Sequence, residues 1–420
     1  MKQVTLSIIG CGNRSSIYAK LASENPSKYK LVAAADLNIR RAEKIRDFSN
    51  NPDFKVFDSA DALFNEGKIS DIMIIGTQDQ FHYEPCKKAL ELGYDVLLEK
   101  PISPSIQEIV DLQSIAEKLG RKLQVCYVLR YTPFYKKVKA IIESGILGDI
   151  VSINANEGVL PWHQAHSFVR GKWCRVEDST PMIVAKCCHD TDIIQWLLGK
   201  KCESVSSYGA LTYFVEKNAP EGAPKRCTDG CPHADNCEYN ALRYASDMRE
   251  PWLELVYDNF EDATSEEIIE WLKTSDYSKC VYRCDNNVVD HQIVAMEFEG
   301  KVTANLTMTA FETGRHIEVF GSKGVLKGGQ YLKRKTGCDV IVDLWNGETI
   351  SYTVSEKTEG DHHMGGDEGL MGAFYDEMVG EGNPVSSYIQ SHVMAYAAEE
   401  SRISNQKIEL DEFVKSIINK

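Results

Sequence analysis

Short apolar runs alternate with helix-like segments in the first third of the chain. The apolar runs, which predict strands, are Val4–Ile9, Leu31–Ala35, Ile72–Ile75, Asp95–Leu98 and Leu123–Tyr127. Between them, apolar residues at helical intervals predict helices up to about Leu21, then over Ile39–Asn50, Phe81–Leu92 and Ile106–Leu119. Strands that alternate with helices are typical of βαβ units. We therefore expect an α/β domain with a doubly wound parallel sheet over residues 1–127.

After residue 127 the predicted strands follow one another without helices between them. Helices are predicted over Pro133–Ser144 and Met182–Leu198, and strands over Ile150–Glu157, Glu203–Leu211, Gln292–Phe298, Lys301–Ala310, His316–Gly321 and Gly324–Gly328. Glu299–Gly300 is a predicted hairpin turn. This order is typical of an α+β domain with a large, mostly antiparallel open sheet, here over residues 128–420. Helices return near Leu370–Val379 and Ser387–Gln406, and we expect them to pack back on the first domain.

The composition limits the classes of partner. The chain has 420 residues, 43% of them hydrophobic and 26% charged, which is enough to bury two ordinary cores. Its formal net charge of -15 argues against nucleic acids and anionic membranes, because both bind basic surfaces. No run of 18 apolar residues predicts a membrane span, and the N-terminus lacks the long apolar segment of a signal peptide. We therefore expect a soluble cytoplasmic protein.

The clearest chemical signal follows the first strand. Gly10-Cys11-Gly12 joins this strand to a helix, and Asp36 closes the second strand. The first glycine permits a tight turn, and the second lets the backbone approach a pyrophosphate that the helix N-terminus then binds. Asp36 is placed to accept hydrogen bonds from an adenosine ribose. This context favours a dinucleotide site over a glycine turn with no ligand.

The same segment indicates which dinucleotide binds. A carboxylate at Asp36 repels a 2′-phosphate and so favours NAD, although Arg40 and Arg41 leave NADP possible. Asn13 and Arg14, which open the helix, are assigned to the cofactor site. Ser15 stands where the third glycine of the motif falls, and it predicts slightly looser packing of the helix on the strand.

A second chemical signal, Glu99-Lys100-Pro101, follows the fourth strand. The carboxyl ends of the strands line the ligand crevice in doubly wound sheets. Pro101 biases Lys100 away from helical geometry and holds it extended. Burial beside a nicotinamide cation would lower the pKa of this lysine and make it a usable base. Spacing alone fits a solvated surface lysine equally well.

Four motifs in order resemble the glucose–fructose oxidoreductase, inositol dehydrogenase and rhizopine-catabolism (Gfo/Idh/MocA) family. They are Gly10-Cys11-Gly12, the Thr77…His82 segment, Glu99-Lys100-Pro101 and Gly145-x-x-Gly148-Asp149. The resemblance spans nearly the whole chain. It implies a Rossmann domain and a larger second domain whose open sheet forms homodimers or homotetramers.

In function, the resemblance implies an NAD(P)-dependent oxidoreductase. Such an enzyme moves a hydride between nicotinamide and a secondary hydroxyl of a sugar, polyol or glycoside. Two alternatives stay open. One is a glycosidase that recycles bound NAD and cleaves by oxidation and elimination, and the other is a non-catalytic dinucleotide-binding sensor on the same fold.

The resemblance also implies roles for individual residues. Lys100 matches the active-site lysine of the family, and His189 matches its catalytic histidine. Glu99, Thr77 and His82 match positions around the nicotinamide end of the cofactor.

Many polyol dehydrogenases of this family carry an aspartate four residues before that histidine, where this chain has Ala185. On the predicted helix, Lys186 and Asp192 share the face of His189, whereas Asp190 points away. Sequence does not choose between the first two. Lys186 is favoured as the replacement because it is one residue from the position of the missing aspartate.

Aromatic and cationic residues near the crevice indicate a sugar-like substrate. Arg130 and Tyr131 follow the strand Leu123–Tyr127, and Trp162 and Trp173 fall in loops after Ile150–Glu157. Aromatic faces cover the C–H surfaces of sugars while cationic side chains bond the hydroxyls. Lys186 and His189 complete the predicted substrate residues. Both tryptophans fit packing anchors equally well, and the cationic donors leave an acidic sugar possible.

Thirteen cysteines without a signal peptide indicate a reducing compartment. Cys227-x3-Cys231-Pro232-His233-x3-Cys237 lies in an insertion, Val215–Tyr244, and offers ligands for a structural zinc ion. The pair Cys280-x3-Cys284 is a possible neighbour. The spacing matches no familiar zinc motif, so reduced, unliganded thiols are favoured and no metal is assigned. The Asp361-His362-His363 segment, within the polar stretch Glu348–Gly369, is interpreted as a polar loop.

Overall fold

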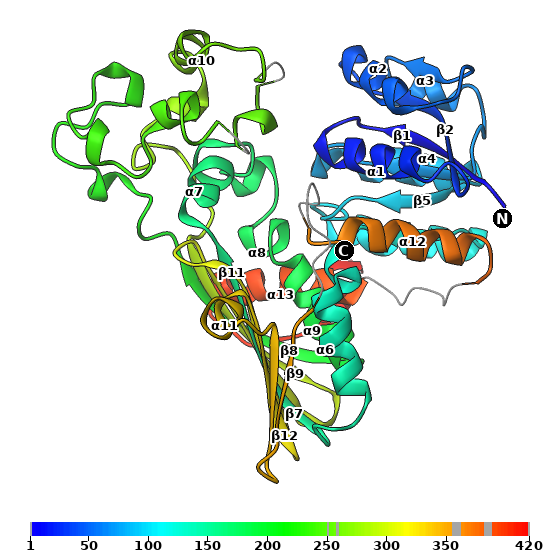
Figure 1. Ribbon diagram of the computed structural model, residues 1–420, viewed down its shortest axis with the longest axis vertical. Helices are drawn as coiled ribbons and strands as arrows, with labels where there is room; N and C mark the ends of the chain where they lie inside the picture. The colour runs from blue at the N-terminus through cyan, green and yellow to red at the C-terminus, as the bar shows by residue number, and fades with distance from the viewer. Residues whose placement is uncertain (1, 250–251, 258–259, 355–362, 382–388, 419–420) are drawn as a thin grey trace.

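The computed structural model describes residues 2–249, 252–257, 260–354, 363–381 and 389–418. Figure 1 shows three regions: the N-terminal lobe in blue, a large sheet seen nearly edge-on, and a loop-rich region in green. The site described below lies where the N-terminal lobe faces the helices of the large sheet. Among the described residues, no helix is long and apolar enough to cross a membrane.

The N-terminal lobe is built on a six-stranded parallel sheet. Its strands are β1 (Val4–Ile9), β2 (Tyr29–Ala35), β3 (Lys55–Phe57), β4 (Ile72–Ile75), β5 (Asp95–Leu98) and β6 (Leu123–Val125), in the order β3-β2-β1-β4-β5-β6. Its helices are α1 (Asn13–Glu24), α2 (Ile39–Phe48), α3 (Ala60–Phe64), α4 (Tyr83–Glu91) and α5 (Ile106–Leu119). The strand order reverses between β1 and β4, and such a reversal opens a ligand crevice at the carboxyl ends of the strands.

The second sheet has nine strands in the order β14-β13-β12-β11-β7-β10-β9-β8-β15. They are β7 (Ile150–Val159), β8 (Cys202–Ala210), β9 (His291–Phe298), β10 (Val302–Thr309), β11 (Thr313–Gly321), β12 (Gly324–Gly329), β13 (Val340–Leu344), β14 (Thr349–Tyr352) and β15 (Ile408–Glu409). Only the β7–β10 pair is parallel among the described pairings, so the predicted mostly antiparallel sheet is confirmed. A short turn over Glu299–Lys301 joins β9 to β10, as the hairpin prediction requires.

Helices cover one face of this sheet. Three of them are α6 (Pro133–Glu143), α9 (Cys188–Leu198) and α13 (Ile389–Ser404), and their apolar residues share one core with the sheet. Along β10, buried and exposed residues alternate, because successive side chains point to opposite faces of a strand. The remaining helices are α7 (Pro161–His163), α8 (Met182–Ala185), α10 (Ser265–Leu272), α11 (Gln330–Thr336), α12 (Gly366–Met378) and α14 (Leu410–Ile418).

The prediction of one helix over Met182–Leu198 is wrong. The segment forms α8 and α9, with Lys186 and Cys187 between them. Cys187 has φ -95° and ψ 6°, outside helical geometry, and the Lys186 Nζ reaches Glu157 Oε1 at 3.2 Å. Apolar periodicity continues through the break, which is why the sequence pattern hides it. His189 therefore lies in the first turn of a new helix.

Helix α12 packs on the N-terminal lobe. Leu370, Phe374 and Tyr375 share a core cluster with residues of α1 and β2. The Tyr375 hydroxyl donates to the Lys2 carbonyl at 2.9 Å. Figure 1 shows α12, in orange, lying beside the blue lobe. The return of a late helix to the first lobe places the N-terminus of α12 at the crevice.

Candidate active site

The turn between β1 and α1 is shaped for close approach by a ligand. Gly10 has φ +80°, and a Cβ there would lie 2.6 Å from the Thr77 nitrogen. A Cβ at Gly12, by contrast, would meet no described atom within 4 Å. No side chain of the described residues caps the N-terminus of α1, and its first turn carries no acidic residue. Free N–H groups beside open space are the features that bind a pyrophosphate.

Asp36 lies beside this turn, as predicted. Its carboxylate accepts hydrogen bonds from the Cys11 nitrogen at 2.7 Å and the Asn38 nitrogen at 2.8 Å. The neighbouring Leu37 side chain is 92% exposed, which is unusual for a large apolar residue next to a conformationally fixed turn. A carboxylate next to an exposed apolar surface suits an adenosine, whose ribose needs acceptors and whose base needs an apolar face. Asn13 is exposed at the start of α1.

Arg14 joins the cofactor turn to two distant parts of the chain. Its Nε donates to Glu99 Oε1 at 2.9 Å, and its Nη1 donates to Asp367 Oδ2 at 3.1 Å. The Tyr18 hydroxyl donates to the same Glu99 oxygen at 2.7 Å. Burial alone would raise the pKa of Glu99, but the charges of Arg14 and Lys100 lower it below its ordinary value. Glu99 therefore stays ionised and holds Arg14 in place.

Lys100 projects from the end of β5 toward the second lobe. Its Nζ lies 3.4 Å from the Ala185 carbonyl oxygen on α8, and the Lys100–Pro101 peptide bond is cis. Its backbone nitrogen lies 3.1 Å from Glu99 Oε2. The lysine is half-buried between the lobes, so it is not the solvated surface side chain that spacing alone also allowed.

His189 is buried near Lys100. Its ring lies 6.0 Å from that of Tyr127 and 6.4 Å from that of His363, measured between centroids. Its Nδ1 has no hydrogen-bond partner among the described residues. Burial, reinforced by the positive charge of Lys100, lowers the pKa of His189 well below its ordinary value. The ring is therefore neutral at neutral pH and has an unused nitrogen, which suits it to bind a substrate hydroxyl.

Thr77 and His82 lie between the two chemical centres. The His82 ring contacts the Pro101 carbonyl at 2.8 Å through Nδ1 and the Thr77 carbonyl at 3.2 Å through Nε2. The Thr77 hydroxyl donates to the Phe81 carbonyl. Both ring nitrogens of His82 thus hold the loops after β4 and β5 together, and the residue braces the position of Lys100.

Lys186 does not pair with His189 in this structure. Its Nζ forms an ion pair with Glu157 Oε1, and Arg315 bridges Glu157 and Asp190 at 2.9 and 2.7 Å. Burial raises the pKa of Asp190 to about 6, against the opposing charge of Arg315. Sequence reasoning did not find Glu157 or Arg315, because both lie on strands of the large sheet and no local motif marks them.

Arg130 and Tyr131 are engaged in packing. The Arg130 Nε donates to Asp192 Oδ2 at 2.6 Å in a buried ion pair, and the guanidinium lies 5.8 Å from the Tyr127 ring centroid. Tyr131 packs against the core cluster of the N-terminal lobe, close to Gly369 of α12. Their assignment to substrate binding stays a prediction.

The two tryptophans lie in different surroundings. Trp162 is buried in a cluster of the loop-rich region, with the Arg243 guanidinium 5.0 Å from its ring. Trp173 lies at the lobe boundary, where its Nε1 donates to Asp79 Oδ2 at 3.2 Å and the Lys172 Nζ lies 4.5 Å from its ring. Trp173 thus contacts the loop after β4, whereas Trp162 is a packing residue in this structure.

The structure adds His363 and Asp367, which sequence reasoning did not assign to the site. His363 Nδ1 lies 2.9 Å from Asp367 Oδ2 and 3.1 Å from Arg14 Nη1. His363 lies in the turn before α12, as the interpretation of this segment as a polar loop expects, while Asp361 and His362 lie outside the described residues. Sequence reasoning missed its contacts because Arg14 is far away in the sequence and no local motif marks them.

Two family models match the chain. One describes an oxidoreductase family with an NAD-binding Rossmann fold and matches residues 4–127. The other describes the C-terminal α/β domain of the same oxidoreductase family and matches residues 139–419. The first match identifies the N-terminal lobe as an NAD-binding Rossmann domain.

Individual proteins agree with this match. YteT of Bacillus subtilis (strain 168), classed as an oxidoreductase, is 24% identical over 338 residues, which are 77% of each chain. An inositol 2-dehydrogenase of Rubrobacter xylanophilus is 25% identical over 215 residues, 50% of this chain and 57% of that one. The structure of a scyllo-inositol dehydrogenase from Lactobacillus casei, with NAD(H) and scyllo-inositol, has a TM-score of 0.66 and 19% identity. It covers 98% of this chain and 100% of that chain.

Proposed function

Because the chain belongs to the Gfo/Idh/MocA family of oxidoreductases, we propose that it is an NAD-dependent dehydrogenase of a secondary hydroxyl. The substrate class is a sugar, polyol or glycoside, in line with the inositol bound or oxidised by the relatives described above. The observation that carries the proposal is the meeting of Lys100, from one lobe, with the buried and neutral His189, from the other.

The residues at the cofactor turn fit NAD. The Gly10–Gly12 backbone and the N-terminus of α1 would hold the pyrophosphate, and Asp36 would hold the adenosine ribose. Bound NAD supplies a hydride acceptor. Asp36 also disfavours a 2′-phosphate by charge repulsion, which keeps NAD ahead of NADP.

The protein residues then handle the proton of the substrate hydroxyl. Lys100, which already donates to the Ala185 carbonyl, turns its ammonium toward the substrate oxygen and fixes its position. His189 accepts the hydroxyl proton on its unpartnered nitrogen as the carbinol is oxidised, and returns it in the reverse direction. Because burial lowers the pKa of His189, the ring stays ready to accept a proton as the pH falls through 6.5.

Many polyol dehydrogenases of the family carry an aspartate where this chain has Ala185. We assign the role of that aspartate to the cluster of His363, Asp367 and Arg14. A carboxylate held by Arg14 fixes the His363 ring, whose centroid is 6.4 Å from that of His189. Lys186, which pairs with Glu157, adds a cationic donor near His189, and such a donor suits hydroxyl-rich and acidic sugars.

Substituting Lys100→Met tests the proposal. With NAD and a panel of polyols, aldoses, uronic acids and glycosides, the parent protein should produce NADH with one substrate class. The variant should lose at least about a hundredfold of that turnover, because it lacks the ammonium group that positions the substrate oxygen beside His189, while its NAD affinity by calorimetry changes little.

Lys118→Met, an exposed change on α5, is the matched control and should keep full turnover. Equal turnover by Lys100→Met and the parent would refute the assignment. Cleavage of a glycoside without net NADH would point instead to the redox-neutral glycosidase, and NAD binding with no turnover of any class would point to the sensor.

A further inference from the structure

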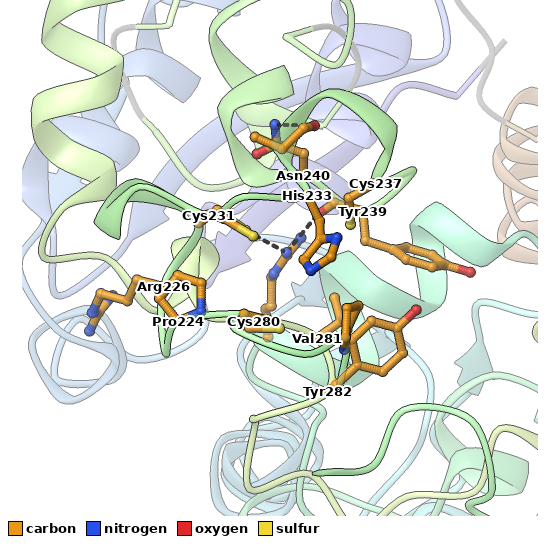
Figure 2. Close-up of a pocket in the computed structure, with 15 residues that line it drawn as sticks. Pro224, Arg226, Cys231, His233, Cys237, Tyr239, Asn240, Cys280, Val281 and Tyr282 are labelled. Atoms are coloured by element: carbon orange, nitrogen blue, oxygen red, sulfur yellow. Dashed lines mark hydrogen bonds between the residues drawn. The ribbon is translucent and has the colours of Figure 1, made fainter. Parts of the chain in front are cut away.

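A small pocket in the loop-rich region brings four cysteines together. Cys227, Cys231 and Cys237 come from one loop, and Cys280 comes from a separate segment further along the chain. Cys237 lies close enough to Cys227 and Cys231 for their charges to interact, as does Cys280 with Cys227 and Cys237. Figure 2 shows Cys231, Cys237 and Cys280 around this pocket. The fold thus supplies a fourth thiol that the local sequence motif lacks.

Backbone contacts hold the two segments side by side. An isolated antiparallel bridge joins Arg226 to Lys279, directly before Cys227 and Cys280. The Cys280 nitrogen also donates to the Lys225 carbonyl at 2.9 Å. The main chain therefore holds the two cysteine-bearing segments side by side, whatever rotamers the cysteine side chains adopt.

A buried cation lies against the thiols. Arg170 is 4% exposed, and its guanidinium donates to the carbonyls of Lys279 and Tyr239 at 2.8 and 2.7 Å. Its Nη2 also lies 3.7 Å from the Cys227 sulfur, and its Nη1 has no hydrogen-bond partner in the described part of the chain. A buried positive charge without enough acceptors is costly unless an anion lies beside it. Among the described residues that line this pocket there is no carboxylate, so thiolates formed at the cysteines when a metal binds would supply that anion.

We propose that Cys227, Cys231, Cys237 and Cys280 bind one zinc ion in a closed structural site. Four thiols release four protons to solvent as they bind, and Zn²⁺ with four thiolates carries a net charge of about -2. Arg170 offsets part of that charge, which accounts for a guanidinium buried among sulfurs. The site is independent of the proposed dehydrogenase activity, because it lies outside the residues assigned to that chemistry.

The geometry favours four sulfurs over three sulfurs and an imidazole. His233 lines the same pocket, but its Nε2 already contacts the Glu221 carbonyl at 2.7 Å on the exposed side. The described residues that line the pocket offer four thiols and one imidazole as possible ligands, which suits a single ion.

The sulfurs must turn inward when the ion binds. Among the described residues, no three His, Cys, Asp or Glu groups converge closely enough here to coordinate a metal. Because each cysteine sulfur swings through staggered positions about one bond, the backbone bridge can stay in place while the sulfurs close to about 2.3 Å from zinc.

The surrounding region has the kind of structure that a metal stabilises. Its described residues between β8 and β9 form short 3-10 turns and one helix, α10, around two small apolar clusters. Loop-rich segments with small cores gain much of their stability from a bound metal or a cross-link.

Metal analysis of the full-length protein tests the proposal without any activity assay. Protein expressed with added zinc and purified without a metal-affinity tag or chelator should contain about one zinc per chain by mass spectrometry. Cys231→Ser and Cys280→Ser should lose it. Cys338→Ser, a half-buried cysteine outside the pocket, should keep it.

A second measurement on the unmodified protein covers the case in which those variants fail to fold. A mercurial thiol reagent should release about one zinc per chain, read with a colorimetric zinc indicator. Four results overturn the proposal: zinc-free native protein, retention of zinc in Cys280→Ser, iron with inorganic sulfide in its place, or an intact mass that shows disulfides among the four cysteines.

Discussion

The ion pair of Arg130 and Asp192 shows that an arginine predicted to bind the substrate can instead stabilise the fold. Their side chains are 7% and 1% exposed and share two hydrogen-bonding contacts. A buried pair contributes little net stability, but removing one partner leaves a buried charge uncompensated. The pair ties the segment after β6 to α9, which carries His189.

Arg130→Met should therefore lower the free energy of unfolding by about 3–5 kcal/mol. Urea unfolding measures this loss, and the double variant Arg130→Met with Asp192→Leu should regain much of it. If Arg130 instead serves the substrate alone, the single variant keeps its stability and shows only a higher KM.

At the same scale, Arg14 has a structural role in addition to its predicted place in the cofactor site. It contacts Glu99, Asp367 and His363, and thereby joins the Rossmann domain to the N-terminus of α12. The Arg14 guanidinium has several hydrogen-bond donors and is largely covered by protein, so it needs several acceptors at once. These acceptors come from parts of the chain that are far apart in the sequence. Asp367 is one of these acceptors, and the hydrogen bonds from His363 and Arg14 lower its pKa despite burial.

At the scale of elements, the turn between β1 and α1 contains one glycine that the fold requires and, two residues later, one glycine that leaves room for a ligand. Gly10 is required by its positive φ and by the nearby Thr77 backbone, whereas Gly12 faces open space. The two glycines of one motif thus serve different ends: the first permits the turn, and the second leaves room for the ligand.

Gly12→Ala should lower the stability of the ligand-free protein by no more than about 1 kcal/mol, the usual difference between glycine and alanine at a helix N-cap. Its NAD affinity should fall at least about tenfold, or about 1.4 kcal/mol, because the added methyl occupies the path of the pyrophosphate. Thermal unfolding with and without NAD, together with calorimetry, measures both effects. Gly10→Ala is the contrasting variant and should lower stability itself; a Gly12→Ala protein that binds NAD normally would contradict this reading of the turn.

Most strands and the cofactor turn were predicted because they rest on local pattern, whereas the role of Lys100 came from the family resemblance. The short strands β3, β13, β14 and β15 were not predicted. Val4–Ile9 and Asp95–Leu98 were placed correctly, since apolar runs and their flanking glycines and prolines report on neighbouring residues. The ion pair of Lys186 with Glu157, which lies on β7, escaped prediction because no local pattern links residues so far apart in the sequence. The contact between Arg14 and Asp367 escaped for the same reason, as 353 residues separate the partners.

For the whole molecule, the open face of the nine-stranded sheet is the clearest unpartnered surface. Tyr208 and Ile293 face each other across β8 and β9 and are 65% and 51% exposed. Exposed apolar side chains gathered on one sheet face favour association with a second copy. We propose a homodimer or homotetramer formed through this face.

Ile293→Glu should shift the molar mass by light scattering toward that of one chain, because a carboxylate cannot be buried there without a partner. Leu119→Glu, a comparably exposed apolar position on α5, should leave the mass unchanged. A parent protein that already has the mass of one chain would refute the proposed assembly.

The position of α12 also bears on how the protein is made. A ribosome releases the Rossmann segment first, and N-terminal domains generally fold as they emerge. Arg14 and Glu99 are then already in place, but Asp367 and His363 are still to be synthesised. The nascent chain can thus form its nucleotide fold early, whereas its active site is complete only after nearly the whole polypeptide has left the ribosome. A chain that ends before His363 would therefore lack two residues of the cluster around Arg14 and, with them, the apolar side chains of α12 that pack on the first lobe.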